Sequence, residues 1–328
     1  MDSSTPASSS SKSTEPRIAE LTTTSTRNEY ASNNLWRLTT RRVFRQQSAR
    51  VGAAILGFLL LVAIFAPVIA PYDPEQVLIG VESVKKRDSP CIHLLGCPSE
   101  RPQHIMGIDG NVRDQFSRVI YGTRVSLFIG ITTVTFAIII GAVLGLVSGY
   151  FAGWSDNIIM RMMDVLLAFP SLLLAIAIVS VLGPGLENAL LAIAIVSIPI
   201  YARVVRASVL SVKEQDFVSA SRALGASDSR IMFVRILPNA IPPLVVQGTL
   251  GIAAAILSAA ALSFLGLGAQ PPTPEWGTML GSERNQVFTA PHLVFYPGLA
   301  IMLTVLAFNL LGDGLRDALD PRLSQPGE

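Results

Sequence analysis

Long apolar runs alternate with polar segments along this chain. The first run, "VGAAILGFLLLVAIFAPVIA", is residues 51–70, twenty residues without a charged side chain. Because about 20 residues rising about 1.5 Å each span a hydrocarbon core ~30 Å thick, this run predicts a membrane-spanning helix. The pattern predicts five further spans, near 125–147, 157–182, 189–210, 240–266 and 294–315. We therefore expect an all-α membrane protein with six transmembrane helices.

The composition supports a membrane protein and limits the other classes. Half of the 328 residues are hydrophobic and 15% are charged, against about 25% charged residues in soluble chains. The net charge of +2 gives no reason to expect a nucleic-acid partner. The three histidines are scattered and the two cysteines form no C-x-x-C pattern, so we expect no metal site.

Basic residues indicate how the chain crosses the membrane. Arginines cluster just before the first apolar run, which places that end in the cytoplasm. Alternation then places the polar segment 71–118 outside, although Lys85, Lys86 and Arg87 within it weaken the argument. The segment 203–235 carries six Arg and Lys residues. Burying them in lipid would cost on the order of 15–20 kcal/mol, so this segment is expected in the cytoplasm with both termini.

These features divide the chain into four parts. Residues 1–36 are rich in Ser and Thr and are expected to form a disordered cytoplasmic tail. Residues 37–118 hold the first transmembrane helix and an outer loop. Residues 119–316 form the main transmembrane domain, which includes a cytoplasmic loop over 214–238, and residues 317–328 form a second cytoplasmic tail.

The stretch "SASRALGASDSRIMFVRILP", residues 219–238, interrupts the apolar pattern. Just before and within it, Phe217, Ala220, Ser221 and Leu224 are spaced to share one face of a short helix. Gly225 suits the left-handed conformation that ends a helix.

Capping residues extend this prediction to a helix pair. Asp216 is expected to cap the first helix, and Ser227 to cap a second helix that enters the membrane. Pro238 and the Pro242-Pro243 pair are expected to bend or delay that entry. A helix this short needs a surface to dock against. That surface is either the membrane or a cytoplasmic partner protein.

This stretch resembles the cytoplasmic coupling loop of bacterial ABC import permeases. That family's pattern is Glu-Ala-Ala, three residues, Gly, and then about nine residues to an apolar-Leu-Pro end. Ser219-Ala220-Ser221 stand at the first three positions, Gly225 follows, and Ile236-Leu237-Pro238 close the motif. Serine replaces the family's glutamate at Ser219 and its second alanine at Ser221.

The resemblance extends over roughly residues 37–323, to the second permease subunit of dipeptide, oligopeptide and nickel importers. It is especially close to the dipeptide and glutathione members. The segments that carry it are "MGIDGNVRDQFSRVIYGTRVSL" (106–127), "DVLLAFPSLLLAIA" (164–177), "SFLGLGAQPPTPEWGTML" (263–280) and "NLLGDGLRDALDPRL" (309–323). It implies a type I ABC importer permease fold, a five-helix core plus an N-terminal helix, in the bacterial plasma (inner) membrane.

The resemblance also implies a function, partners and site residues. The chain would form the translocation path for di- or oligopeptides with a homologous permease, two cytoplasmic ABC ATPase subunits and an extracytoplasmic binding protein. Glutathione or a nickel chelate is the alternative substrate. The ATPase-coupling residues would be Phe217, Ser219, Ala220, Ser221, Arg222, Leu224, Gly225 and Pro238.

Catalysis is not expected of this chain itself. A Walker A loop requires Gly-Lys-Ser/Thr to hold phosphate, and no Gly-Lys occurs in the sequence. We therefore expect no cofactor on this chain, with ATP and Mg²⁺ used by partner ATPase subunits. Two other classes stay open: a stand-alone secondary transporter, which predicts an internal repeat, and a membrane scaffold without transport.

Several further residues are candidates. Gln247 and Asn309 lie in predicted spans, and either lines the translocation path or makes helix contacts. Arg161 and Asp164 lie one turn apart near a span end, where a structural role is favoured. Cys91 and Cys97 lie in the expected outer loop, where an oxidising exterior would allow a disulfide.

Two outer segments have open interpretations. Trp276 and Glu275 would contact the binding protein or cap the cavity, or else Trp276 anchors the chain at the membrane interface. The stretch "RDQFSRVIYG", residues 113–122, would lie along the outer membrane surface.

Overall fold

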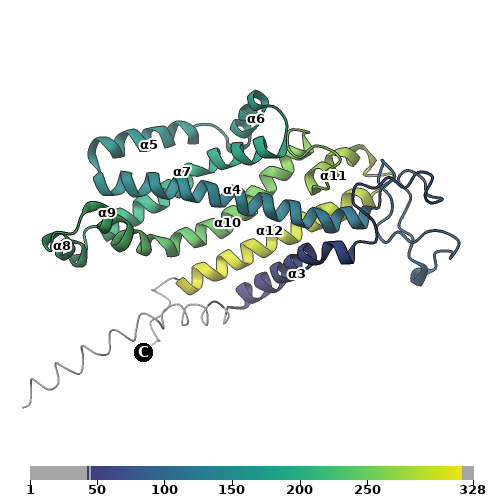
Figure 1. Cartoon of the computed structure of the whole chain (residues 1–328), viewed down its shortest axis with the longest axis horizontal. Coiled ribbons are helices and arrows are strands. Elements are labelled where there is room, and N and C mark those ends of the chain that lie inside the picture. Colours follow the sequence, from purple (N-terminus) through teal and green to yellow (C-terminus); the bar gives the residue numbers. More distant parts are fainter. Residues whose placement is uncertain (1–42, 44–45, 320–328) are drawn as a thin grey trace, which may run out of the picture.

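The computed structural model describes residue 43 and residues 46–319, and within these its regular elements are helices (Figure 1). The α-helices are α3 (Gln47–Ile69), α4 (Gln115–Phe151), α5 (Gly153–Leu167), α6 (Ser171–Leu182), α7 (Leu186–Val212), α8 (Asp216–Ala223), α9 (Asp228–Arg230), α10 (Leu237–Phe264), α11 (Trp276–Glu283) and α12 (His292–Leu319). The 3₁₀ helices are η1 (His93–Leu95) and η3 (Arg284–Gln286), and η2 (Ile231–Ile236) is a π-helix. The tail predicted over residues 1–36 and most of the basic cluster lie outside the described residues.

Five helices of the described part are long and apolar enough to cross a membrane. They are α3, α4, α7, the continuous helix Asp228–Phe264 and α12. The pair α5 and α6 makes a sixth span if it is counted as one, but its two helices are bent by 91°. The all-α, six-span prediction is therefore confirmed in that form, and the span predicted near 157–182 is a bent pair of helices and not one continuous helix. Pro170 explains the break, since it precedes α6 and has no N–H for a continuing helix.

The polar parts of the chain gather at the two ends of the bundle (Figure 1). Helices α8 and α9 lie at one end, which with η2 we call the α8 end. Residues 70–114 and α11 lie at the other, which we call the loop end. The long helices run side by side between them, so the two ends are held at a distance by a helical scaffold.

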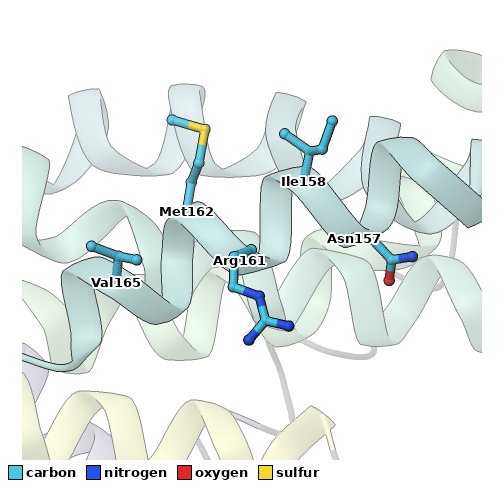
Figure 2. Close-up of a pocket in the computed structure, with 5 residues that line it drawn as sticks. All are labelled: Asn157, Ile158, Arg161, Met162 and Val165. Carbon is cyan, nitrogen blue, oxygen red and sulfur yellow. The ribbon is translucent and has the colours of Figure 1, made fainter.

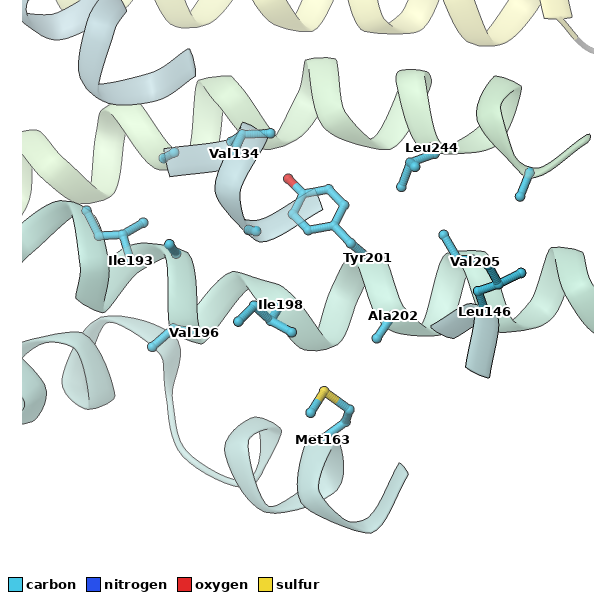
Figure 3. Packing of buried hydrophobic residues seen from close by; sticks show 14 of the residues in the cluster. Val134, Leu146, Met163, Ile193, Val196, Ile198, Tyr201, Ala202, Val205 and Leu244 are labelled. Atoms are coloured by element: carbon cyan, nitrogen blue, oxygen red, sulfur yellow. The ribbon is translucent and has the colours of Figure 1, made fainter. Parts of the chain in front are cut away.

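Helices α4 and α7 form the centre of the core through a row of glycines. A Cβ atom on Gly145 would lie 2.3 Å from the Ala202 carbonyl oxygen, and one on Gly141 would lie 2.8 Å from Tyr201 Cβ. Gly149 approaches α7 one turn further along. Small residues at every fourth position let two membrane helices approach closely. Tyr201 and Ala202 are seen within the resulting apolar cluster in Figure 3.

Helix α4 begins earlier than the sequence analysis expects. Asp114 caps it by accepting a hydrogen bond from the Ser117 N–H at 2.7 Å. Gln115 and Arg118 are buried. The segment 113–122 is therefore the packed first part of α4, and the prediction that it lies along the outer surface is wrong.

Candidate functional site at the α8 end

Helix α8 has only eight residues and must be held by its surroundings. Asp216 lies in its first turn and Arg222 in its last, so both charges interact favourably with the helix dipole. Gln215 occupies the N-cap position and makes no side-chain cap. The expectation that Asp216 caps the helix is therefore wrong, because Asp216 is already the first helical residue.

The end of α8 forms a two-bond cap around Gly225. Gly225 has φ +78°, the left-handed conformation that the sequence predicts. Its N–H donates to the Arg222 carbonyl at 3.0 Å, and the Ala226 N–H donates to the Ser221 carbonyl at 3.1 Å. These are the two bonds of a Schellman motif, which satisfies carbonyls that a helix end leaves free. Gly225 thereby sets the turn between α8 and the next helix.

The second helix enters the bundle without a break. Ser227 occupies its N-cap position, but its side chain makes no cap. The helix then widens into η2, where the Leu237 N–H donates to the Met232 carbonyl five residues earlier. Pro238 follows as the second residue of α10 and has no N–H to give. The wide turn accommodates this proline, so the helix continues from η2 into α10, and a bend at Pro238 or the Pro242-Pro243 pair stays a prediction.

One side chain attaches α8 to the apolar core. Val218 is wholly buried and belongs to the same cluster as Ile231 and Ile236. The opposite side of the helix is open, because Leu224 is 88% exposed and Phe217 39% exposed. The remaining candidate coupling residues on α8 are exposed or half-buried: Ser219, Ala220, Ser221 and Arg222. The structure thus brings these residues together on one short, largely exposed helix.

Tyr150 connects this helix pair to the end of α4. Its hydroxyl donates to the Asp228 carboxylate on α9 and accepts from Arg222 Nη2 on α8 at 3.5 Å. The hydrogen bond to the Tyr150 hydroxyl raises the pKa of Arg222 above its ordinary value. Lys213 adds a second link, donating to the Gly149 carbonyl at 3.3 Å. Sequence reasoning missed Tyr150, because nothing in its own segment marks a partner 78 residues away.

Ion pairs join α7 to α5 next to this site. Arg206 forms a bidentate pair with Asp156, with both distances 2.6 Å, and Arg203 pairs with Asp164 at 2.6 Å. Asp164 therefore pairs across helices rather than with Arg161, its neighbour along α5. Arg161 lines a groove of about 540 Å³ on α5, with Asn157, Ile158, Met162 and Val165 (Figure 2).

The two predicted path residues lie on neighbouring helices. Gln247 is half-buried on α10 and Asn309 is exposed on α12. These helices pack against each other at Leu250 and Gly312. The role of both side chains in a translocation path stays a prediction.

The loop end differs from the sequence interpretation at two residues. Trp276 is wholly buried, and its Nε1–H donates to the Val119 carbonyl at 3.0 Å. Glu275 is 1% exposed and caps α11 by accepting from the N–H groups of Gly277 and Thr278. Burial raises the pKa of Glu275. Trp276 is thus a core residue, and its expected roles in partner contact or membrane anchoring are wrong.

The two cysteines of the loop end are joined. Cys91 and Cys97 form a disulfide with their Cα atoms 5.5 Å apart. The ring they close contains η1, whose Leu94 and Leu95 side chains are exposed.

Comparison with known proteins identifies the family. Residues 141–325 match the family described as binding-protein-dependent transport system inner membrane component. The chain belongs to this family. Residues 34–85 match the N-terminal transmembrane domain of oligopeptide transport permease C. The chain is a multi-pass membrane protein and a translocation permease subunit of an ABC importer.

Named relatives match almost the whole chain. A dipeptide transport system permease protein of Alkalihalophilus pseudofirmus is 47% identical over 295 residues, 90% of this chain and 92% of the relative. A di/tripeptide permease of Pseudomonas aeruginosa is 51% identical over 85% of this chain and 91% of the relative. A glutathione permease of Escherichia coli is 49% identical over 88% of this chain and 91% of the relative.

A solved structure supports the fold. The inward-facing MetNI methionine ABC transporter matches with a TM-score of 0.51 and 20% identity, over 62% of this chain and 98% of the matched chain. At this identity the match shows the type I importer permease fold and nothing of the substrate.

Proposed function

We propose that this permease carries di- or oligopeptides into a bacterial cell across the plasma (inner) membrane. Relatives named for dipeptide and di/tripeptide transport support this substrate class, since they are 47% and 51% identical over most of the chain. The proposed assembly pairs this chain with a homologous permease, two cytoplasmic ATPase subunits that use ATP and Mg²⁺, and an extracytoplasmic binding protein. Both termini lie in the cytoplasm.

The observation that carries the coupling proposal is the exposed face of α8. Leu224 is 88% exposed at the tip of a helix that the chain holds by one buried side chain, Val218. Phe217, 39% exposed, lies two turns away on the same face, and grouped exposed apolar side chains are typical of a docking contact. We infer that an ATPase subunit covers this face, and that its closure moves α8, Gly225 and the second helix together. Docking must differ between the two states of the transporter, because equal binding would shift nothing.

The experiment replaces Leu224 by Asp in the assembled transporter. We expect the ATPase subunits to be lost on purification, and ATP-driven peptide uptake to fall by about tenfold or more, because a buried unpaired carboxylate costs several kcal/mol at an interface. The matched control is Leu94→Asp, which changes a leucine 94% exposed at the loop end. It should leave ATPase binding intact. Normal ATPase binding and uptake in Leu224→Asp would refute the coupling role.

Glutathione is the second candidate substrate, supported by the glutathione permease relatives at 49% and 46% identity. Binding of dipeptides and glutathione to the cognate binding protein, followed by uptake of each, separates the two. Uptake by this chain alone without ATP would instead favour a stand-alone transporter.

A further inference from the structure

The loop end contains a buried histidine between two carboxylates. His104 is 3% exposed. Its Nδ1 lies 2.8 Å from Asp114 Oδ1, and its Nε2 lies 3.0 Å from Glu82 Oε2. When both ring nitrogens face carboxylates, both bonds are made only if the ring is protonated, because a neutral imidazole has one donor.

The groups around His104 all favour the charged ring. Tyr72 stacks on the imidazole with the ring centroids 5.2 Å apart, and its hydroxyl donates to Glu82 Oε1 at 2.9 Å. Burial and this bond raise the pKa of Tyr72 to about 12, so it stays a donor. The nearby arginines Arg113 and Arg118 face Asp109 instead. No cation among these neighbours therefore opposes the charge on His104.

The cluster joins parts of the chain that would otherwise be separate. Asp114 also caps α4, accepting from the Ser117 N–H and hydroxyl at 2.7 Å each. Glu82 lies in the loop, 22 residues before His104. The backbone of His104 pairs with Cys91 through two hydrogen bonds of 2.9 and 3.1 Å. His104 thus connects the loop and the start of α4 through its ring, and the disulfide-bonded segment through its backbone.

We propose that His104, Glu82 and Asp114 form a protonation-controlled clasp that fixes the loop and its disulfide-bonded segment 91–97 to the start of α4. In its closed form the imidazolium donates to both carboxylates. Loss of the ring proton removes one of the two donors and leaves a carboxylate facing a nitrogen lone pair. The loop is then held by fewer bonds and opens more often.

The direction of the pH dependence follows from the ring's surroundings. Burial lowers the pKa of His104, but the hydrogen bonds and charges of Asp114 and Glu82 outweigh it and raise the pKa above its ordinary value. A raised pKa in the folded protein means that the contribution is complete below the ordinary value of about 6.5. It is lost as the pH rises through the raised value.

The test measures hydrogen exchange of residues 78–104 in the full-length protein in lipid nanodiscs, with the disulfide intact. Rates are corrected for the chemical exchange rate at each pH. Between about pH 6 and about pH 9 we expect the protection of this segment to fall, by about tenfold for each unit by which the pKa of His104 is raised in the folded protein. Protection that does not change with pH in the unaltered protein would overturn the proposal.

Variants assign the response to the clasp. His104→Gln should remove the pH response, whereas His93→Gln, which changes an exposed histidine of the same loop, should keep it. Glu82→Gln should move the midpoint to lower pH, because one of the two favourable charges is gone. A normal pH response in His104→Gln, its loss in His93→Gln, or an unchanged midpoint in Glu82→Gln would each contradict the clasp.

Discussion

The two ends of this permease are attached to the same helical scaffold in opposite ways. At the α8 end, a regular helix is held by one buried side chain, Val218, and by the hydroxyl of Tyr150. At the loop end, an irregular segment that a disulfide closes internally is held by a buried histidine cluster and several ion pairs. Regular secondary structure is therefore no measure of how firmly an element is fixed.

Contacts distant in sequence account for the firmness of the loop end. Glu283, at the end of α11, accepts from Arg87 Nε at 2.8 Å and from the Gly110 N–H at 2.9 Å. Arg118 donates to the Pro74 and Pro272 carbonyls at 2.7 and 3.1 Å. Few buried contacts mark an element that opens at low free energy. From this comparison we infer that α8 moves easily relative to the helical scaffold, whereas the loop end is fixed to it.

The largest effect is expected from a core change at the loop end. Trp276→Ala removes a wholly buried indole and its bond to the Val119 carbonyl. We expect a loss of about 3–5 kcal/mol in the free energy of unfolding, measured by chemical denaturation in detergent. The control is Trp154→Ala, whose side chain is 81% exposed and which should change stability by less than about 0.5 kcal/mol. An equal loss of unfolding free energy in the two variants would contradict the conclusion that buried contacts hold the loop end firmly.

A smaller, local effect is expected at the α8 end. Tyr150→Phe removes the hydroxyl that joins Arg222 and Asp228. Because both partners are charged, we expect a loss of about 1.5–3 kcal/mol of local stability, seen as faster hydrogen exchange in α8 and α9. The matched variant Tyr72→Phe removes a hydroxyl at the loop end. Each variant should loosen its own end only, and faster exchange of α8 in Tyr72→Phe would contradict independent attachment.

Local chemistry explains what the sequence predicts correctly. The apolar runs predict the spans because a membrane requires about 20 apolar residues per helix. The turn at Gly225 is predictable because only the residues next to it decide its conformation. The start of α8 is placed one residue wrong, since a first-turn Asp and a capping Asp look alike in sequence.

The errors concern interactions between distant segments. Trp276 looks like an interfacial aromatic, yet Gly122 of α4 leaves space for its ring: a Cβ there would lie 2.7 Å from the indole. The ion pair of Asp164 with Arg203 joins residues 39 positions apart. The bend between α5 and α6 is hidden by an apolar pattern that continues through Pro170. For Trp276 and Asp164 the deciding partner lies on another element, which periodicity along the chain does not report.

The smallest expected effect compares one glycine at each end. Gly225 and Gly80 both have φ +78°, and a Cβ on either would meet no atom within 4 Å. Replacing either by Ala therefore costs only the left-handed strain, about 1 kcal/mol. In Gly225→Ala we expect faster hydrogen exchange of residues 216–224 and weaker stimulation of ATP hydrolysis by the binding protein, because α8 has few other contacts to hold it. Gly80→Ala costs the same strain, but the loop keeps its bonds from Arg87 to Glu283 and from His104 to Asp114, so stimulation should be unchanged. Equal loss of stimulation in both variants would mean that the loop end moves with transport as much as α8 does, and the division into a fixed and a movable end would be wrong.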